Sequence, residues 1–235
     1  VCEAAAHRHR GVCIEGAPSR EHVLNMIAWL PKVGMNSYFI QFREAYAFYE
    51  RWYRCLGNPT LPTEPFDQAL AIQLTTEAAA FAKSRGLLYH AVGHGWTCEA
   101  VGVPSLSWVP TDYAITAENR ELLAEIKGKR DFFNRISLNT NLCYGNPEAR
   151  RKVVAEIVRY AEAHPEVDYL HFWLADDVNN QCECPRCSDT RPADFYVMML
   201  NALDSEYRRA KRNHYDLGDG IRIRKVRLDR DIFSG

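Results

Sequence analysis

The sequence has no long apolar run and no excess of either charge. None of its apolar stretches approaches the roughly 20 residues that cross a bilayer, so we expect no membrane span. Its 29 lysines and arginines balance 30 aspartates and glutamates, which argues against a general nucleic-acid binder. The opening residues lack the basic and apolar segments of a signal peptide, so we expect a cytoplasmic protein, or a secreted one if a leader has been trimmed.

Linkers and nucleotide-binding fingerprints are missing as well. No Gly/Ser-rich or low-complexity stretch divides the 235 residues, so we expect one domain over residues 1–235. Neither G-x-G-x-x-G nor a P-loop follows any predicted strand, which argues against a doubly wound nucleotide-binding fold. A composition of 47% hydrophobic and 25% charged residues is typical of a globular domain that needs no disulfide scaffold.

Short apolar strands alternate with amphipathic helices along the chain. The predicted strands cover residues 11–16, 36–42, 87–92, 135–139, 167–174 and 221–226. The predicted helices cover residues 19–30, 67–85, 118–127, 146–161 and 194–210. This alternation predicts a parallel sheet, either open or closed into a (β/α) barrel.

Polar side chains gather at the ends of these strands, which favours the barrel. They are Glu15, Gln41, Arg43, His90, His94, Asn139, Asn141, Asp176 and Asp177. In a barrel all strand ends meet on one face, where catalytic residues lie. We therefore expect an α/β protein with a TIM-type (β/α)8 barrel. About six strand–helix units are visible where a closed barrel has eight, so we expect a barrel that is incomplete at its C-terminus.

The densest group of candidate functional residues ends the strand predicted at 167–174. Asp176 and Asp177 are adjacent carboxylates, of which one can be kept protonated by the charge of the other, and the Trp173 ring can stack on a sugar. We interpret the aspartates as catalytic, and Trp173 and Asn180 as substrate-binding. The alternative is an Asp pair that caps a helix or is solvated in a loop. Adjacent residues on a strand also point to opposite faces, so we expect one of the two to reach the pocket.

The eight cysteines are unevenly spread, and three of them fall within six residues. Cys182, Cys184 and Cys187 resemble half of a zinc knuckle, whose thiolates bind a metal in tetrahedral geometry. Cys143, just past the preceding predicted strand, is the candidate fourth ligand, although a histidine or aspartate could take its place. We predict a structural zinc ion. The alternatives are a redox Cys-x-x-Cys and a set of buried reduced thiols.

The remaining candidate contacts to a ligand lie around a glycine-rich strand exit. His90, His94 and Trp96 fall in a segment that glycines interrupt, so the two histidines do not share a helix face as zinc ligands would. We interpret them as contacts to sugar hydroxyls. The other predicted substrate contacts are Glu15, Gln41, Arg43, Asn139 and Asn141.

Several longer segments resemble one family. They are residues 10–16, 29–38, 93–98, 139–144 and 173–187. Together they are similar to the glycoside-hydrolase-like barrel family known as domain of unknown function 4838. That family is related to the family 163 endo-β-N-acetylglucosaminidases and more distantly to family 20 hexosaminidases and family 67 α-glucuronidases. The resemblance covers most of residues 8–205, whereas the last thirty residues depart from the pattern.

The resemblance implies a substrate-assisted retaining mechanism. In related hexosaminidases one carboxylate holds the acetamido group of the substrate and the other protonates the leaving oxygen, roles that Asp176 and Asp177 would take. The family 20 pattern has Asp followed by Glu, and Asp177 is a shorter acid, so Glu183 and Glu15 are the alternative donors. We therefore expect a glycoside hydrolase that acts on a β-N-acetylglucosaminide. The second hypothesis is a non-catalytic carbohydrate-binding barrel with a structural zinc site.

Overall fold

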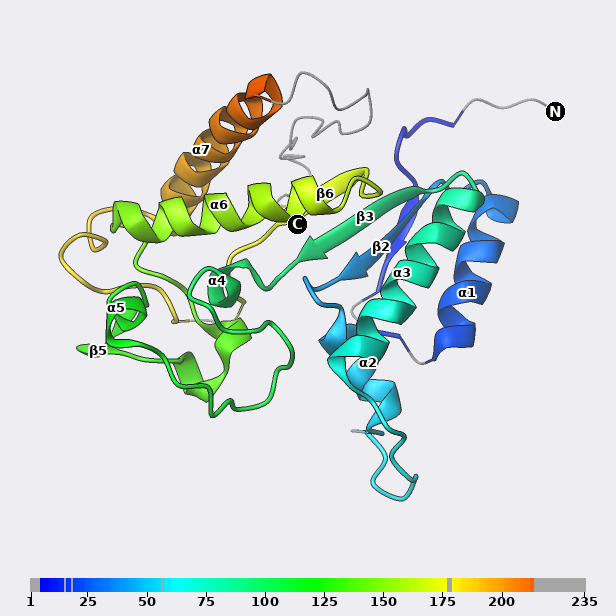
Figure 1. Cartoon of the computed structure of the whole chain (residues 1–235), viewed down its shortest axis with the longest axis horizontal. Helices are drawn as coiled ribbons and strands as arrows, with labels where there is room; N and C mark the ends of the chain where they lie inside the picture. Colours follow the sequence, from blue (N-terminus) through cyan, green and yellow to red (C-terminus); the bar gives the residue numbers. More distant parts are fainter. Residues whose placement is uncertain (1–4, 15, 18, 56, 177–178, 214–235) are drawn as a thin grey trace.

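The computed structural model describes residues 5–14, 16–17, 19–55, 57–176 and 179–213 (Figure 1). The main strands are β1 (Gly11–Cys13), β2 (Ser37–Gln41), β3 (Leu88–Gly93) and β6 (Tyr169–Phe172). The α-helices are α1 (Arg20–Trp29), α2 (Tyr46–Tyr53), α3 (Gln68–Ser84), α4 (Trp96–Glu99), α5 (Ala117–Arg120), α6 (Pro147–Ala163) and α7 (Pro192–Asn213). A short hairpin, β4 (Glu125–Ile126) and β5 (Lys129–Arg130), and the 3-10 helices η1 (Leu30–Val33), η2 (Phe133–Arg135) and η3 (Ser137–Asn139) complete the fold.

The main sheet is parallel and follows the order β1-β2-β3-β6. The prediction of an α/β protein with a parallel sheet is confirmed. Within the described residues the sheet has four strands and is not closed into a barrel, because β1 and β6 are its two edges. No described helix combines the length and the apolar character needed to cross a membrane.

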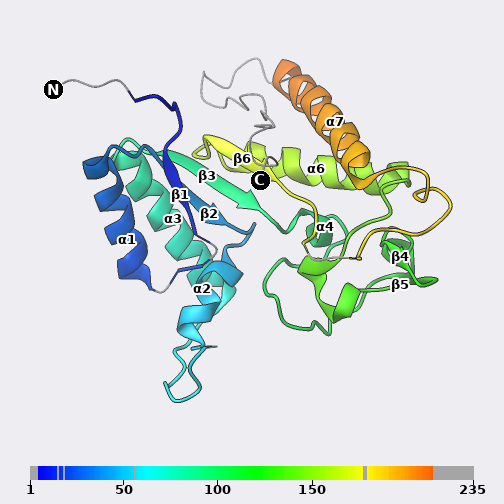
Figure 2. The ribbon, with the colours of Figure 1, turned by 180° about the vertical axis from the view of Figure 1, so that it is seen from behind.

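The two faces of the sheet carry different side chains because successive residues of a strand point to opposite faces and paired residues of neighbouring strands share a face. Tyr38 pairs with Tyr89 and Ile40 with Ala91, so these buried residues share one face. Helix α3 packs against β2 and β3 and α1 packs against α3, so the two helices lie side by side (Figures 1 and 2). The opposite face carries aromatic and imidazole rings, among them Phe39, His90, Tyr169 and His171.

Side-chain caps start the three helices that the sequence marks most clearly. Ser19 accepts a hydrogen bond from the backbone N–H of His22 at 3.1 Å, and Asp67 accepts one from Leu70 at 2.8 Å. Asn146 caps α6 in the same way, with Pro147 in the first helical position. The predicted helices at 19–30, 67–85, 146–161 and 194–210 are therefore present, with bounds shifted by a few residues.

Two predicted elements are wrong, and both lie between β3 and α6. Residues 135–139 form 3-10 turns rather than a strand, because Asn134 and Arg135 have φ values of 51° and 63° and break the extended backbone. Strand β6 therefore pairs directly with β3. The helix predicted at 118–127 is only one turn long, and Lys127 and Gly128, both with positive φ, form the tip of the β4–β5 hairpin. The strand predicted at 221–226 lies outside the described residues.

Candidate metal centre

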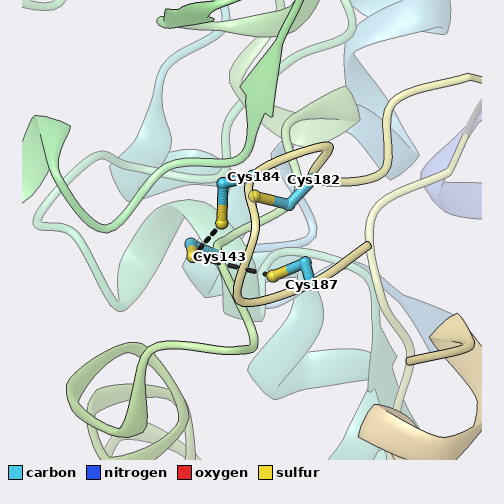
Figure 3. Close-up of side chains that lie close together, drawn as sticks. All are labelled: Cys143, Cys182, Cys184 and Cys187. Carbon is cyan, nitrogen blue, oxygen red and sulfur yellow. Dashed lines mark hydrogen bonds between the residues drawn. The ribbon is translucent and has the colours of Figure 1, made fainter. Parts of the chain in front are cut away.

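The four cysteines predicted as metal ligands lie together (Figure 3). Cys143 follows η3 on the way to α6, and the other three lie in the loop between β6 and α7. All four sulfur atoms are within 4.8 Å of one another, and the Cys143 sulfur lies 3.5 Å from Cys184 and 3.7 Å from Cys187. Four thiols this close together are compatible with the binding of one tetrahedral metal ion.

The surroundings of the cluster favour thiolates. Backbone N–H groups donate to sulfur at two points, from Glu125 to Cys182 and from Gly145 to Cys187, each at 3.2 Å. The hydrogen bond from Cys143 lowers the pKa of the Cys182 thiol to about 4, since Cys143 keeps the shared proton. A bound metal ion would displace such protons, because thiolates are the ligating form.

Arg130 lies against the same cluster. Burial disfavours its charge, but hydrogen bonds to the thiols of Cys184 and Cys143 outweigh burial and raise its pKa. The guanidinium is held in place by the Leu123 carbonyl and by Glu125, whose carboxylate lies 3.3 Å from Nη2. A positive charge at this point offsets part of the excess negative charge that four thiolates bring to a divalent ion.

The donor set fits a structural metal ion. Four thiolates fill a tetrahedral coordination sphere and leave no position for water or substrate, in contrast to catalytic zinc sites. Zinc bound here would tie the loop after β6 to the segment before α6. The loop also lies tightly on Gly145, where an added Cβ would be 2.4 Å from the Arg186 carbonyl oxygen. The helix after the Cys-x-x-Cys begins only at Pro192, unlike the helix-opening position of redox motifs.

A second group of predicted residues meets at the carboxyl ends of β3 and β6. The imidazole of His94 lies 3.9 Å from the carboxylate of Asp176 and its centroid lies 4.9 Å from the ring of Trp173. The Asp176 side chain is 64% exposed, whereas that of His94 is 11% exposed. Sequence reasoning missed Trp108, whose ring lies 5.7 Å from His94. No motif marks Trp108, because it lies in a long loop distant in sequence from both strands.

The amides of Asn141 and Asn180 hold the segment that follows β6 and carries Asp176. Both side chains are completely buried and joined by a hydrogen bond of 3.0 Å. Asn180 also donates to the backbone carbonyls of Asp176 and of Asn139, and Asn141 accepts from the Tyr144 hydroxyl at 2.8 Å. Both amides therefore form hydrogen bonds within the protein.

Three further predicted contacts are packed inside the protein. Trp96 is 0% exposed, and its indole N–H donates to the His171 carbonyl at 2.9 Å. Arg43 forms ion pairs with Glu99 and Glu156 and with its neighbour in sequence. Gln41, at the end of β2, is buried as well.

His90 lies at mid-strand in β3, away from the strand end. Its Nδ1 is 2.9 Å from Nε2 of His171, a residue that sequence reasoning missed. Burial is the main cause that lowers the pKa of His90 to about 3 and that of His171 to about 4. Because a buried imidazole next to another is costly to protonate, both rings are neutral at pH 7.

The candidate acids are distributed differently from the prediction of one shared site. Glu15 and Asp177 lie outside the described residues. Glu183 is exposed and accepts a hydrogen bond from the backbone of Lys127 at 2.7 Å, so it helps to fix the cysteine loop to the β4–β5 turn.

Neither a scan against protein-family models nor a search of curated proteins finds a match to this chain. The geometry of its own residues therefore carries the functional argument.

Proposed function

We propose that the chain is a glycoside-hydrolase-like α/β domain that acts on a β-N-acetylglucosaminide, and that a structural zinc ion holds its active-site loop. The observation that carries the proposal is the convergence of His94, Trp173 and Asp176 at the carboxyl ends of β3 and β6. A carboxylate, an imidazole and an indole are the groups that protonate, orient and stack on a sugar ring.

Asp176 is positioned for contact with a substrate. Its side chain is mostly exposed while its backbone is held by Asn180. The Trp173 ring packs over β3 only because Gly93 has no side chain, since a Cβ there would lie 2.7 Å from the ring. In the proposed mechanism one carboxylate of the Asp176–Asp177 pair orients the acetamido group of the substrate, and the other protonates the leaving oxygen.

The barrel architecture is part of the same proposal. The strands of the main sheet follow chain order without reversal, whereas a doubly wound sheet reverses at a switch point. Sequential parallel strands joined by helices are the arrangement of one segment of a (β/α) barrel. Catalytic residues of barrels lie at the carboxyl ends of strands, where Asp176 and His94 are found.

Substitution of the aspartates tests the activity. Asp176→Asn and Asp177→Asn should each lower the rate of hydrolysis of an aryl β-N-acetylglucosaminide by about 100-fold or more, with an unchanged melting temperature. Asp189→Asn, an exposed aspartate after the cysteine loop, is the matched control. Wild-type rates in both active-site variants would contradict the assignment.

Elemental analysis tests the metal. Protein prepared without chelator should contain one zinc ion per chain, and Cys143→Ser should lose it. Cys98→Ser should keep it, because Cys98 is buried elsewhere and donates to the Gly95 carbonyl. Protein that contains iron instead would keep the site but change the metal, and metal-free wild-type protein would contradict the proposal.

A non-catalytic carbohydrate-binding role is the second candidate. It is favoured by the open edge of the sheet at β6 within the described residues and by the large exposure of the Asp176 carboxylate. Binding on a glycan array without turnover of any bound sugar would select this role.

A further inference from the structure

A pocket of about 500 Å3 lies beside the cysteine cluster. Its walls come from the loop between β6 and α7, from the first turn of α7 and from Tyr144 in the segment before α6. Two of the candidate metal ligands, Cys182 and Cys187, line it, whereas His94, Trp173 and Asp176 do not. The pocket is therefore distinct from the strand-end site, and its volume is in the range of small-molecule binding sites.

The lining combines aromatic rings with uncharged hydrogen-bonding groups. Tyr144 and Phe195 are the buried aromatic residues, and Gln181, Ser188 and Thr190 are partly or fully exposed. The Thr190 hydroxyl forms no hydrogen bond to another described residue, and the Ser188 hydroxyl has only long contacts of 3.4 and 3.5 Å. These hydroxyls are thus available to a ligand.

The charge of the lining restricts the chemistry of the ligand. No lysine, arginine or histidine is found among the described residues that line the pocket, and its charged member is Glu183. A phosphorylated, sulfated or carboxylated ligand would meet no positively charged side chain among the described lining residues and would be repelled by the Glu183 carboxylate. A neutral ligand rich in hydroxyl groups matches both the aromatic rings and the uncharged hydrogen-bonding groups of the lining.

We propose that this pocket is a binding site for a neutral saccharide of one or two rings. The apolar face of the sugar packs toward Tyr144 and Phe195, and its hydroxyls bond to Gln181, Ser188 and Thr190. Because Cys182 and Cys187 form part of the wall, metal binding shapes the pocket and saccharide binding depends on it. The site works by binding alone and needs no hydrolysis at Asp176.

Calorimetric titration of the zinc-loaded chain with N-acetylglucosamine, its β-linked disaccharide and N-acetylglucosamine 6-phosphate tests the site. The two neutral sugars should bind, and the phosphate should bind at least about tenfold more weakly. The double variant Ser188→Ala/Thr190→Val should weaken binding of the neutral sugars by about tenfold at unchanged zinc content. Thr76→Val, which removes an exposed hydroxyl on α3, is the matched control. Chelation of the metal should abolish binding.

The outcomes separate this proposal from the proposed hydrolase. Asp176→Asn alters the strand-end site and not the pocket, so the component of neutral-sugar binding that the Ser188→Ala/Thr190→Val variant weakens should persist in Asp176→Asn. Loss of binding in Asp176→Asn with full binding in the double variant would place the sugar at the strand ends and overturn the pocket. Absence of binding by the wild type, or equal binding of the 6-phosphate, would also overturn it. Saccharide binding in the pocket without any hydrolysis would overturn the proposed function alone.

Discussion

Arg130 carries a positive charge into contact with the cysteine cluster while it remains mostly buried. Its side chain is 12% exposed, so the charge is sustained by the thiols of Cys143 and Cys184 and by Glu125. Groups outside the coordination sphere commonly change metal affinity as strongly as a weak ligand does. We therefore expect Arg130 to influence metal affinity through its contacts with the cysteines.

Replacement of Arg130 measures this contribution. Arg130→Gln should weaken zinc binding by about 10- to 100-fold, because the thiolates lose a compensating charge and a hydrogen-bond donor. Competition with a chromophoric chelator gives the affinity. Arg135→Gln, which removes an exposed arginine paired with Asp112, should leave it unchanged. Equal affinity in the two variants would show that Arg130 has no part in the centre.

Gly145 tests how tightly the cysteine loop is held. In Gly145→Ala the new Cβ would collide with the Arg186 backbone, which must move, so we expect a loss of about 1–3 kcal/mol in unfolding free energy and weaker zinc binding. Urea denaturation measures the first effect. Gly57→Ala is the control, since a Cβ at Gly57 meets no atom within 4 Å. A fully stable Gly145→Ala protein would mean that the loop is not anchored there.

His90 on β3 and His171 on β6 are titratable side chains that contact each other across these two paired strands. Both pKa values in the folded protein lie below the value of about 6.5 expected in the unfolded chain. As the pH falls below that value, the unfolded chain takes up protons before the folded protein does. The contribution of the neutral His90 and His171 to folding stability is therefore fully present above about pH 7 and is lost as the pH falls toward 4.

Removal of one imidazole should flatten this dependence. The urea midpoint of the wild type should fall between about pH 7 and pH 5, and the fall should be smaller in His90→Gln, because one proton-binding group of the unfolded chain is gone. His164→Gln, a half-exposed histidine at the end of α6, should keep the wild-type slope. The same slope in all three proteins would contradict the role of the His90–His171 pair.

Local signals were sufficient for the elements with strong caps and simple periodicity. Ser19, Asp67 and Asn146-Pro147 mark helix starts that the structure contains, because a side-chain cap acts within four residues of chain. The prediction of a strand at 135–139 was wrong because the apolar residues of this segment are compatible with a strand as well as with 3-10 turns. Its conformation depends on the left-handed backbone at Asn134 and Arg135 and on packing against distant chain.

Figure 2 shows strands β1–β3 with helices α1–α3 on one side of the described structure, and α4, the β4–β5 hairpin, α6 and α7 on the other. The four clustered cysteines lie in loops of this second region, before α6 and between β6 and α7. One continuous apolar core includes residues of the sheet as well as Cys143, Cys184 and Cys187, but the cysteine loop itself has little regular structure. Metal binding should therefore stabilise the second region much more than the first.

Hydrogen exchange after metal removal tests this division. Chelation should raise the exchange of amides in residues 179–190 and in the β4–β5 hairpin, which the loop contacts through Glu125 and Glu183. Amides of β2 and β3 should exchange as slowly as before. Uniform loss of protection would mean that the metal supports the entire fold.

The residue pattern of the chain was enough to identify the parallel α/β class, the starts of the main helices and the four cysteines of the candidate metal centre. These features depend on short spacings, on caps and on the chemistry of thiols. The open edge of the sheet, the direct pairing of β6 with β3 and the burial of Arg43, Trp96 and Asn141 came from packing between segments far apart in sequence. The same packing placed His94 near Asp176 and Arg130 near the thiols. Only the folded backbone brings residues that are so far apart in sequence close to one another.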